Sequence, residues 1–531
     1  MRRLLPLMLT VLPAFASAQK NAVLYQAEGV SYQVPALSID SVKFLDGNSR
    51  ALFWLQDGRK VSYAVSSLDS ICFVSSGAGN AFPAAQDIVS SLNGVVLPSA
   101  SEIASTSIKE VVTTVKDNPE YDDFLENYTP ETTVTIEYSG TQAKYSGTLP
   151  KGVTVDIKGA HVVVSSTKGK VRYRLQGSTA NGSFKIADMG EDNKKLILEL
   201  YGVNITNPMG AAINIQSGKA VYVKLQQGKD NFLKDGPVYF KTEGEDMKGT
   251  FFSEGQLLFC GTGNLTVTSI GGHGICSDDY IRIRQNTGKI TVNSVKDGFN
   301  TKDRLVMYGG TISVTSADEG ISVGKGDYCQ YGGSLTITTQ GTKSHAVSAT
   351  GNACIAGGLF DACVMGTASK CLTADSLVNV SGGFVRLTTQ GDPEFDADKN
   401  DYSTSACIKT AGGVLISGGA RLLMSNSGLG GKCINSDAGV NMENATVTAV
   451  NTGIDFSRES YSAKSRVVDA VNVTIGPGAF VQLAGARTAI HSSGSLSVNG
   501  GQTFAYTMDE TANSLTGKSV LSQTGGMILF K

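Results

Sequence analysis

Acidic side chains recur at fixed distances from a repeated apolar position between residues 270 and 330. Asp297 and Glu319 each lie two residues before such a position, and Asp279 and Asp303 each lie four residues after one. If successive repeats stack, the members of each pair become neighbours, and like charges directly opposite one another destabilise a sheet. Ca²⁺ removes such repulsion by taking six to eight oxygen ligands, carboxylates and backbone carbonyls included. We therefore expect structural calcium between repeats, with Asp278 as a further ligand.

A face neutralised by basic side chains is the alternative, because Lys302, Lys325 and Arg304 stand among these acids. The segment 396–401 superficially resembles a calcium loop. It lacks the glycine at position six and the glutamate at position twelve, where Cys407 stands. Calcium therefore remains a hypothesis that is centred on residues 278–327.

The sequence gives little support for nucleophilic catalysis or for a zinc site. None of the four histidines stands in a recognisable nucleophile motif, and no C-x-x-C occurs among the nine cysteines. Cys371, Cys407 and Cys433 share a repeat position that elsewhere holds Gly or Ala, which favours buried small apolar side chains. Cys329 and Cys354 each precede a glycine pair by three residues, so they are expected to stack and could form a cross-link.

The repeat that positions these residues pairs a small residue with an apolar one. The apolar members are spaced by 24, 22, 26, 25, 36 and 26 residues, and the long step contains an insertion at 392–404. They are Ile275, Phe299, Ile321, Val347, Leu372, Ile408 and Ile434. Units of this length without a helix fit one turn of a parallel β-helix, in which equivalent residues stack about 4.8 Å apart. Leucine-rich repeats have a similar length, but their pattern is absent, and propeller blades are longer.

Four segments are expected along the chain. Residues 1–18 have the charged start, apolar stretch and A-x-A ending of an export signal, and no later segment predicts a transmembrane helix. Residues 19–76 contain a short duplication and predict a small β-module. A linker at 77–119 contains a helical stripe from Ile103 to Val115, and residues 120–531 form the β-helix. The mature protein is expected in the periplasm, on the cell surface or secreted.

Composition excludes several classes of protein. Lys and Arg number 45 against 47 Asp and Glu, so the net charge of −2 argues against a nucleic-acid-binding surface. Hydrophobic residues make up 41% of the chain, which excludes wholesale disorder. The oligomeric state is not predicted.

Several segments together resemble one family of exported bacterial carbohydrate-binding-domain proteins with a pectate-lyase-like, right-handed β-helix. They are 122–127 (DDFLEN), 210–217 (GAAINIQS), 244–256 (GEDMKGTFFSEGQ), 272–280 (GHGICSDDY), 296–303 (KDGFNTKD) and 318–321 (DEGI). The resemblance covers about residues 120–455. It implies an all-β, right-handed, single-stranded parallel β-helix that binds plant-type or acidic polysaccharide, holds structural calcium near Asp297 and Asp303, and performs no catalysis. Phe299 and Glu319 depart from the family's usual Ile and Asp.

Three functions follow as hypotheses. The first is polysaccharide binding, with rings that could stack on sugar faces at Tyr280, Tyr308, Tyr328 and Tyr331. The second is a calcium-dependent, pectate-type polysaccharide lyase, for which Lys302, Arg282, Arg284 and Arg304 are candidate bases by position. The third is a structural adhesin or envelope spacer, because solenoids often serve as interaction surfaces. We favour the first, with no catalytic residues.

Overall fold

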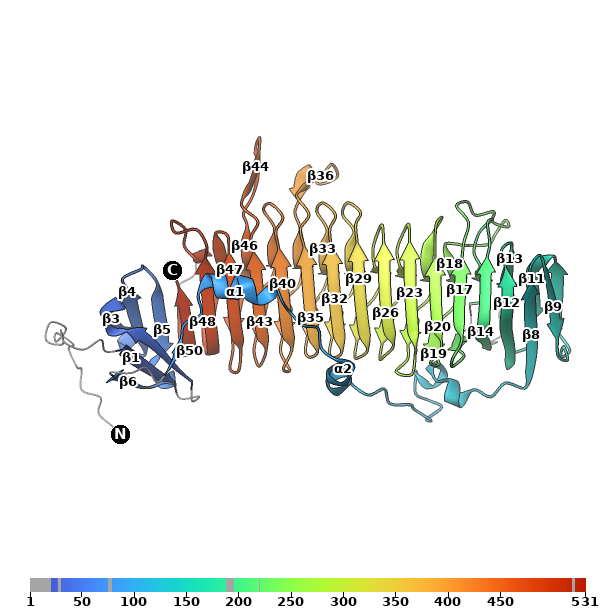
Figure 1. Cartoon of the computed structure of the whole chain (residues 1–531), viewed down its shortest axis with the longest axis horizontal. Coiled ribbons are helices and arrows are strands. Elements are labelled where there is room, and N and C mark those ends of the chain that lie inside the picture. The colour runs from blue at the N-terminus through green and yellow to red at the C-terminus, as the bar shows by residue number, and fades with distance from the viewer. Residues whose placement is uncertain (1–20, 27–29, 75–78, 188–194, 219, 518–520) are drawn as a thin grey trace.

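Apolar side chains stacked in register form the interior of the molecule. The computed structural model describes residues 21–26, 30–74, 79–187, 195–218, 220–517 and 521–531. In it Ile275, Phe299 and Ile321 are partners on adjacent parallel strands, and the ladder continues through Val347, Leu372, Ile408 and Ile434. All seven side chains are buried. The ladder predicted from the repeat is confirmed, and the fold is a parallel β-solenoid of about 14 turns (Figure 1).

Most turns of the solenoid contribute one strand to each of three parallel sheets, whereas longer strands of the first and last turns run through two or three of the sheets. Sheet 1 contains β11 (Ala160–Ser166), β13 (Gly182–Ile186), β15 (Ile213–Ile215), β18 (Gly249–Ser253), β21 (His273–Ser277), β24 (Phe299–Thr301), β27 (Ile321–Val323), β30 (His345–Ala349), β33 (Lys370–Ala374), β38 (Ala406–Thr410), β41 (Lys432–Ser436), the start of β46 (Arg466–Ile475), the start of β48 (Thr488–Thr507) and β49 (Leu515–Gly517). Sheet 2 contains β8 (Thr132–Ser139), β12 (Val171–Thr179), β14 (Leu196–Thr206), β16 (Val221–Leu225), β19 (Leu257–Cys260), β22 (Ile281–Ile283), β25 (Leu305–Met307), β28 (Tyr328–Gln330), β31 (Ala353–Ile355), β34 (Val378–Val380), β39 (Val414–Ile416) and β42 (Gly439–Met442). Sheet 3 contains β17 (Asp230–Lys234), β20 (Asn264–Thr268), β23 (Lys289–Ser294), β26 (Thr311–Ser316), β29 (Ser334–Thr339), β32 (Leu359–Val364), β35 (Phe384–Thr389), β40 (Arg421–Asn426), β43 (Thr446–Asn451) and β47 (Phe480–Gly485).

The bends of each turn explain the small residues of the repeat. A side chain added at Gly274, Gly298 or Gly320 would clash with a buried Val or Ile of sheet 3 and with the next turn's backbone. The later turns place Cys371, Cys407 and Cys433 at this position, all fully buried free thiols, as predicted. Cys329 and Cys354 lie opposite one another on β28 and β31, so their predicted stacking is also confirmed, with both thiols free.

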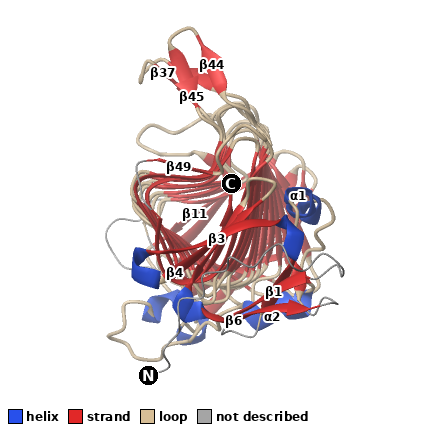
Figure 2. Cartoon of the chain, turned by 90° about the vertical axis from the view of Figure 1, so that its left-hand side faces the viewer, coloured by secondary structure: helices blue, strands red, loops and turns tan. Residues whose placement is uncertain are grey.

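The N-terminal module packs on the far end of the solenoid. Its duplicated segments both fold as strand, short 3-10 turn and strand: β2 (Ser31–Pro35) with β3 (Ile39–Leu45), and β5 (Lys60–Ala64) with β6 (Leu68–Val74). The other strands are β1 (Asn21–Gln26), β4 (Arg50–Leu55) and β7 (Asn80–Ala81). β5 pairs antiparallel with the last strand, β50 (Leu521–Phe530), so the module covers the C-terminal turn (Figures 1 and 2). At the other end, β9 (Gln142–Ser146) and β10 (Val153–Lys158) pair antiparallel with the first turns.

The linker returns along the outside of the solenoid to its first turn (Figure 1). It contains two helices, α1 (Ala85–Leu92) and α2 (Ala100–Thr106), and the predicted helix from Ile103 to Val115 is therefore wrong beyond Thr106. The hydroxyl groups of Ser105 and Thr106 donate to carbonyls within α2, and the N–H of Ile108 donates to the carbonyl of Tyr331 at 2.7 Å. A contact with the solenoid thus replaces the next helical turn.

Two hairpins interrupt the solenoid and project from the same side of it (Figures 1 and 2). The insertion recognised at 392–404 forms β36 (Glu394–Asp396) and β37 (Asp401–Ser403). A second insertion, which the sequence analysis missed, forms β44 (Phe456–Arg458) and β45 (Tyr461–Ala463). The predicted export signal lies outside the described residues. No helix in the described ranges has the length and apolar character needed to cross a bilayer.

Candidate functional site

Three carboxylates meet on the outer face of sheet 1, where the repeat predicted an acidic column. Ligand oxygens of Asp297, Asp318 and Glu319 all lie within 4.8 Å of one another. Asn300 Nδ2 donates to Asp297 Oδ2 at 2.7 Å, and the backbone N–H of Asp297 donates to His273 Nδ1 at 3.2 Å. His273 Nδ1 also lies 3.3 Å from Asp297 Oδ2. The predicted proximity of Asp297 and Glu319 is confirmed, and Asp318 joins them.

The electrostatics of this acidic group favour a bound cation. Burial, a hydrogen bond with Asp318 and the charge of Asp297 together raise the pKa of Glu319 to about 9. No Lys or Arg forms an ion pair with these three carboxylates in the described ranges. Three converging carboxylates that lack a Lys or Arg partner in the described part of the chain fit the oxygen-rich donor set that Ca²⁺ prefers.

The other predicted calcium ligands lie elsewhere. Asp278 lies with Asp246 and Glu254, and Lys248 Nζ lies among them, 2.7 Å from Asp278 and 2.8 Å from Asp246. An ammonium group is therefore already bound to two carboxylates of that cluster. Asp279 and Asp303 stack on adjacent turns, as their spacing predicted. Burial and then the charge of Asp303 raise the pKa of Asp279. The five predicted ligands thus form three separate groups and no single site.

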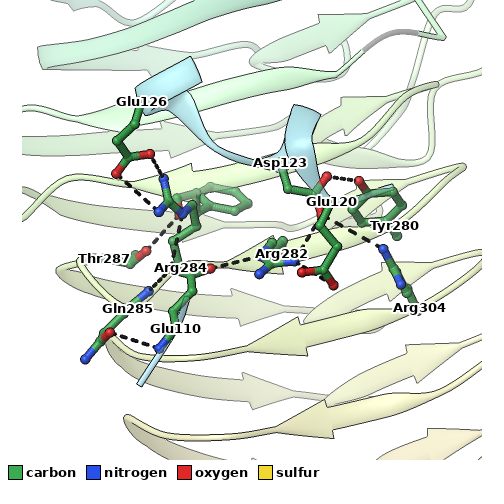
Figure 3. A network of polar contacts seen from close by, with 11 residues as sticks. Glu110, Glu120, Asp123, Glu126, Tyr280, Arg282, Arg284, Gln285, Thr287 and Arg304 are labelled. Carbon is green, nitrogen blue, oxygen red and sulfur yellow. Dashed lines mark hydrogen bonds and ion pairs between the residues drawn. The ribbon is translucent and has the colours of Figure 1, made fainter. Parts of the chain in front are cut away.

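The segment 107–128, which we call the strap, runs from the linker into the solenoid and covers the outer face of sheet 2 (Figure 3). Arg282 donates to Glu110 and Asp123, both at 3.0 Å. Arg284 donates to Glu110 at 3.2 Å and to Glu126 at 2.6 Å. Burial opposes the charge of both arginines, but the surrounding carboxylates raise their pKa values.

Arg282 and Arg284 are therefore wrong as candidate lyase bases. They are 1% and 3% exposed, are charged, and are held by carboxylates beneath the strap. Arg304 stacks over the ring of Tyr280 at 4.5 Å and lies 3.9 Å from Asp123. Lys302 remains exposed on the surface.

The four tyrosines predicted to contact sugar lie in different surroundings. Tyr328 is fully buried inside the solenoid and is therefore wrong as a surface residue. The hydroxyl of Tyr280 donates to Asp123 of the strap, and its ring packs with the apolar side chains under the strap. Tyr308 and Tyr331 stack on each other with ring centres 4.7 Å apart, beside the point where the strap joins the Tyr331 carbonyl.

A cleft of about 690 Å³ lies between the two hairpins and the outer face of sheet 1. Its floor consists of outward side chains of β30, β33, β38, β41 and β46. In one column His345, Lys370, Ala406, Lys432 and Arg466 are successive partners. A second column contains Thr373, Lys409, Asn435 and Asp469. The first column continues the one that contains Asp297 and Glu319, so its charge changes from acidic to basic along the solenoid.

Aromatic rings from the hairpins stand above this floor. Tyr402 lies 4.9 Å from Phe456 and 5.3 Å from Tyr461, measured between ring centres, so the two hairpins support each other. These three rings line the cleft and are partly exposed. A row of polar groups beneath aromatic rings can bind the hydroxyls and the apolar faces of sugars.

Two lysines of the floor stand out electrostatically. Burial, and then the charges of Lys399 and Lys409, lower the pKa of Lys370 to about 8. Burial also lowers the pKa of Lys432. Neither lysine was predicted as a site residue from the sequence. The insertion at 392–404 was the only signal for the cleft, and its residues 396–401 were noted only for a superficial resemblance to a calcium loop.

Comparison with known proteins gives one family and two similar chains. A family model described as "Carbohydrate-binding domain-containing protein" matches residues 158–452. A protein of the same description from Acetivibrio thermocellus is 34% identical over 124 residues, which is 23% of this chain and 42% of that protein. A solved structure described as a polysaccharide lyase-like protein from C. thermocellum has 26% identity and a TM-score of 0.38, and the match covers 48% of this chain and 93% of that one. The chain thus spans less than half the length of the curated relative.

Proposed function

The chain belongs to the family of carbohydrate-binding domain-containing proteins, and from this premise we propose that it binds polysaccharide without catalysis in the cleft between its two hairpins. The observation that carries the proposal is the aromatic roof of Tyr402, Phe456 and Tyr461 above an open, polar floor. The floor follows the solenoid axis from β30 to β46, which suits an extended polymer better than a compact ligand.

Removing the roof tests the binding site. We expect Tyr402→Ala and Tyr461→Ala each to weaken polysaccharide binding about fivefold, since the loss of a sugar–ring contact costs about 1 kcal/mol. Affinity electrophoresis in gels that contain a panel of soluble polysaccharides measures the change. Tyr145→Ala is the matched control, because Tyr145 is 43% exposed on β9 at the opposite end of the solenoid. Equal retardation of all three variants and the wild type would refute the cleft as the site.

The absence of catalysis is part of the proposal. A pectate-type lyase needs a basic side chain at the sugar's acidic carbon, with the uronate carboxylate neutralised. Two of the arginines considered for this role are paired with carboxylates under the strap. We expect no absorbance from an unsaturated product when polygalacturonate is incubated with the protein and calcium. Formation of that product would favour the lyase.

We further propose structural calcium at Asp297, Asp318 and Glu319. Its support is the convergence of three carboxylates that have no Lys or Arg partner among the described residues, together with the raised pKa of Glu319. An ion there would join two adjacent turns of sheet 1 and supply positive charge to both. Export to the periplasm, the cell surface or the medium, and the division into residues 1–18, 19–76, 77–119 and 120–531, also remain proposals.

A further inference from the structure

We propose that Cys329 and Cys354 form a binding site for a soft metal cation that takes two thiolate ligands, such as Cu(I). The two residues are direct partners on the adjacent parallel strands β28 and β31 of sheet 2. The residues on either side of each cysteine are buried inside the solenoid, whereas both cysteines are half-buried. Both thiols therefore lie on the outer face of sheet 2, away from the cleft on sheet 1.

The other seven cysteines, all within the described ranges, lack this combination of exposure and a thiol partner. Cys72 and Cys363 are half-buried, but no cysteine lies opposite either of them on a neighbouring strand of the described chain. The remaining five are buried, namely Cys260, Cys276, Cys371, Cys407 and Cys433. A cation in solvent can therefore reach two adjacent thiols only at Cys329 and Cys354 in the part of the chain that the structure describes.

The spacing of the strands favours a metal over a disulfide. Neighbouring strands of a sheet lie about 4.8 Å apart, so directly paired side chains start from about this separation. A disulfide holds the two Cβ atoms about 3.8 Å apart and would have to pull the two turns together. A metal–thiolate bond is about 2.3 Å long, so two such bonds in line separate the sulfurs by about 4.6 Å. A cation bound between the thiols therefore fits the turns as they stand.

The surroundings of the two thiols select the class of cation. The thiols form a hydrogen bond with each other, and the Tyr331 hydroxyl contacts Cys329. Among the described residues, no group of three converging His, Cys, Asp or Glu side chains includes either cysteine, which argues against four-coordinate Zn²⁺. Thiolates favour soft cations, and Cu(I) binds two of them in a line. Both thiol protons pass to water on binding, and no electron is transferred.

Competition with a chromophoric Cu(I) chelator tests the site on the intact protein, without oxygen and with ascorbate present. We expect Cys329→Ser and Cys354→Ser each to weaken Cu(I) binding about a hundredfold, because one of the two metal–thiolate bonds is lost. Cys363→Ser is the matched control, since Cys363 is a half-buried thiol on the outer face of sheet 3 without a cysteine opposite it. It should bind Cu(I) as the wild type does. Equal affinity in all three variants would overturn the proposal.

Alkylation of the wild type gives a second measurement that requires no variant to fold. One equivalent of Cu(I) should protect Cys329 and Cys354 from N-ethylmaleimide and leave Cys72 and Cys363 reactive, as peptide mass mapping would show. Equal labelling with and without Cu(I) would refute the site. Ready formation of a disulfide between Cys329 and Cys354 in oxidised glutathione, with an unchanged melting temperature, would show that the turns accept the shorter link and would also overturn the assignment.

Discussion

At the scale of single residues, the state of each charged side chain depends on which residue of the adjacent turn lies next to it. Asp297 and Glu319 could be paired from the sequence, because the spacing of the repeat fixes the register of adjacent turns. Asp278 could not be assigned, because adjacent residues at a bend face different neighbours, and the partner of Asp278 is Lys248, from the preceding turn. The surroundings of Lys370 likewise depend on the two hairpins above it, which belong to no repeat.

The raised pKa of Glu319 predicts a pH dependence of stability in the calcium-free protein. Its pKa is about 9 in the fold against an ordinary value of 4.5, so the folded state binds more protons than the unfolded state between these values. Stability should therefore fall as pH rises from about 4.5 to about 9. Melting curves in chelator measure the slope.

Two comparisons check the origin of that slope. Glu319→Gln should remove most of it, because the amide does not ionise. Calcium should raise the melting temperature of the wild type at pH 8 by a few degrees and should have little effect on the variant. A wild-type melting temperature that is the same in calcium and in chelator would reject the metal site.

At the scale of elements, the strap and the hairpins show the limits of prediction from sequence. The strands of sheets 1 to 3 could be located because their pattern repeats. The contacts between Glu110 and Arg282 join residues 172 apart and belong to no repeat. The second hairpin was missed because the ladder was followed only to Ile434, whereas its next member is Val468, after the insertion. The cleft needs both hairpins, so the sequence indicated only half of it.

The contacts of the strap predict that one substitution that removes a charge will strongly lower the stability of the protein. Glu110→Gln leaves Arg282 and Arg284 without the carboxylate they share, and breaking a buried ion pair costs about 3 to 5 kcal/mol. We expect a lower midpoint of unfolding in guanidinium chloride and faster proteolysis within residues 107–128. Glu243→Gln, at an exposed loop position, is the control and should change neither. An unchanged midpoint in Glu110→Gln would mean that the strap does not stabilise the solenoid.

At the scale of the whole molecule, the two ends of the solenoid are protected differently. The first turns are covered by the antiparallel strands β9 and β10, whereas the last turn is covered by the N-terminal module through β5 and β50. Met527 and Leu529 of β50 are fully buried in the module's own apolar core. Nothing in the repeat indicates that the first module lies at the far end, because its contacts are with the opposite terminus.

Removal of the N-terminal module should expose a strand edge that can pair with other chains. A chain that begins at residue 80 leaves the outer edge of β50 unpaired and exposes Met527 and Leu529, and open edges of this kind pair with other chains. We expect concentration-dependent association in light scattering. Leu529→Lys in the shortened chain should reduce it, since an edge charge opposes pairing. A shortened chain that stays monomeric at all concentrations would contradict this role.

The pairing of β5 with β50 also bears on the order of synthesis. The ribosome makes the module first, yet Lys60 to Tyr63 acquire their partners only when Met527 to Phe530 have emerged. Every translation product that stops before residue 521 therefore leaves both β5 and the last turn of the solenoid with an open edge. Only a chain that includes β50 can pair both edges. Incomplete products therefore expose unpaired strand edges, which proteases and chaperones can recognise.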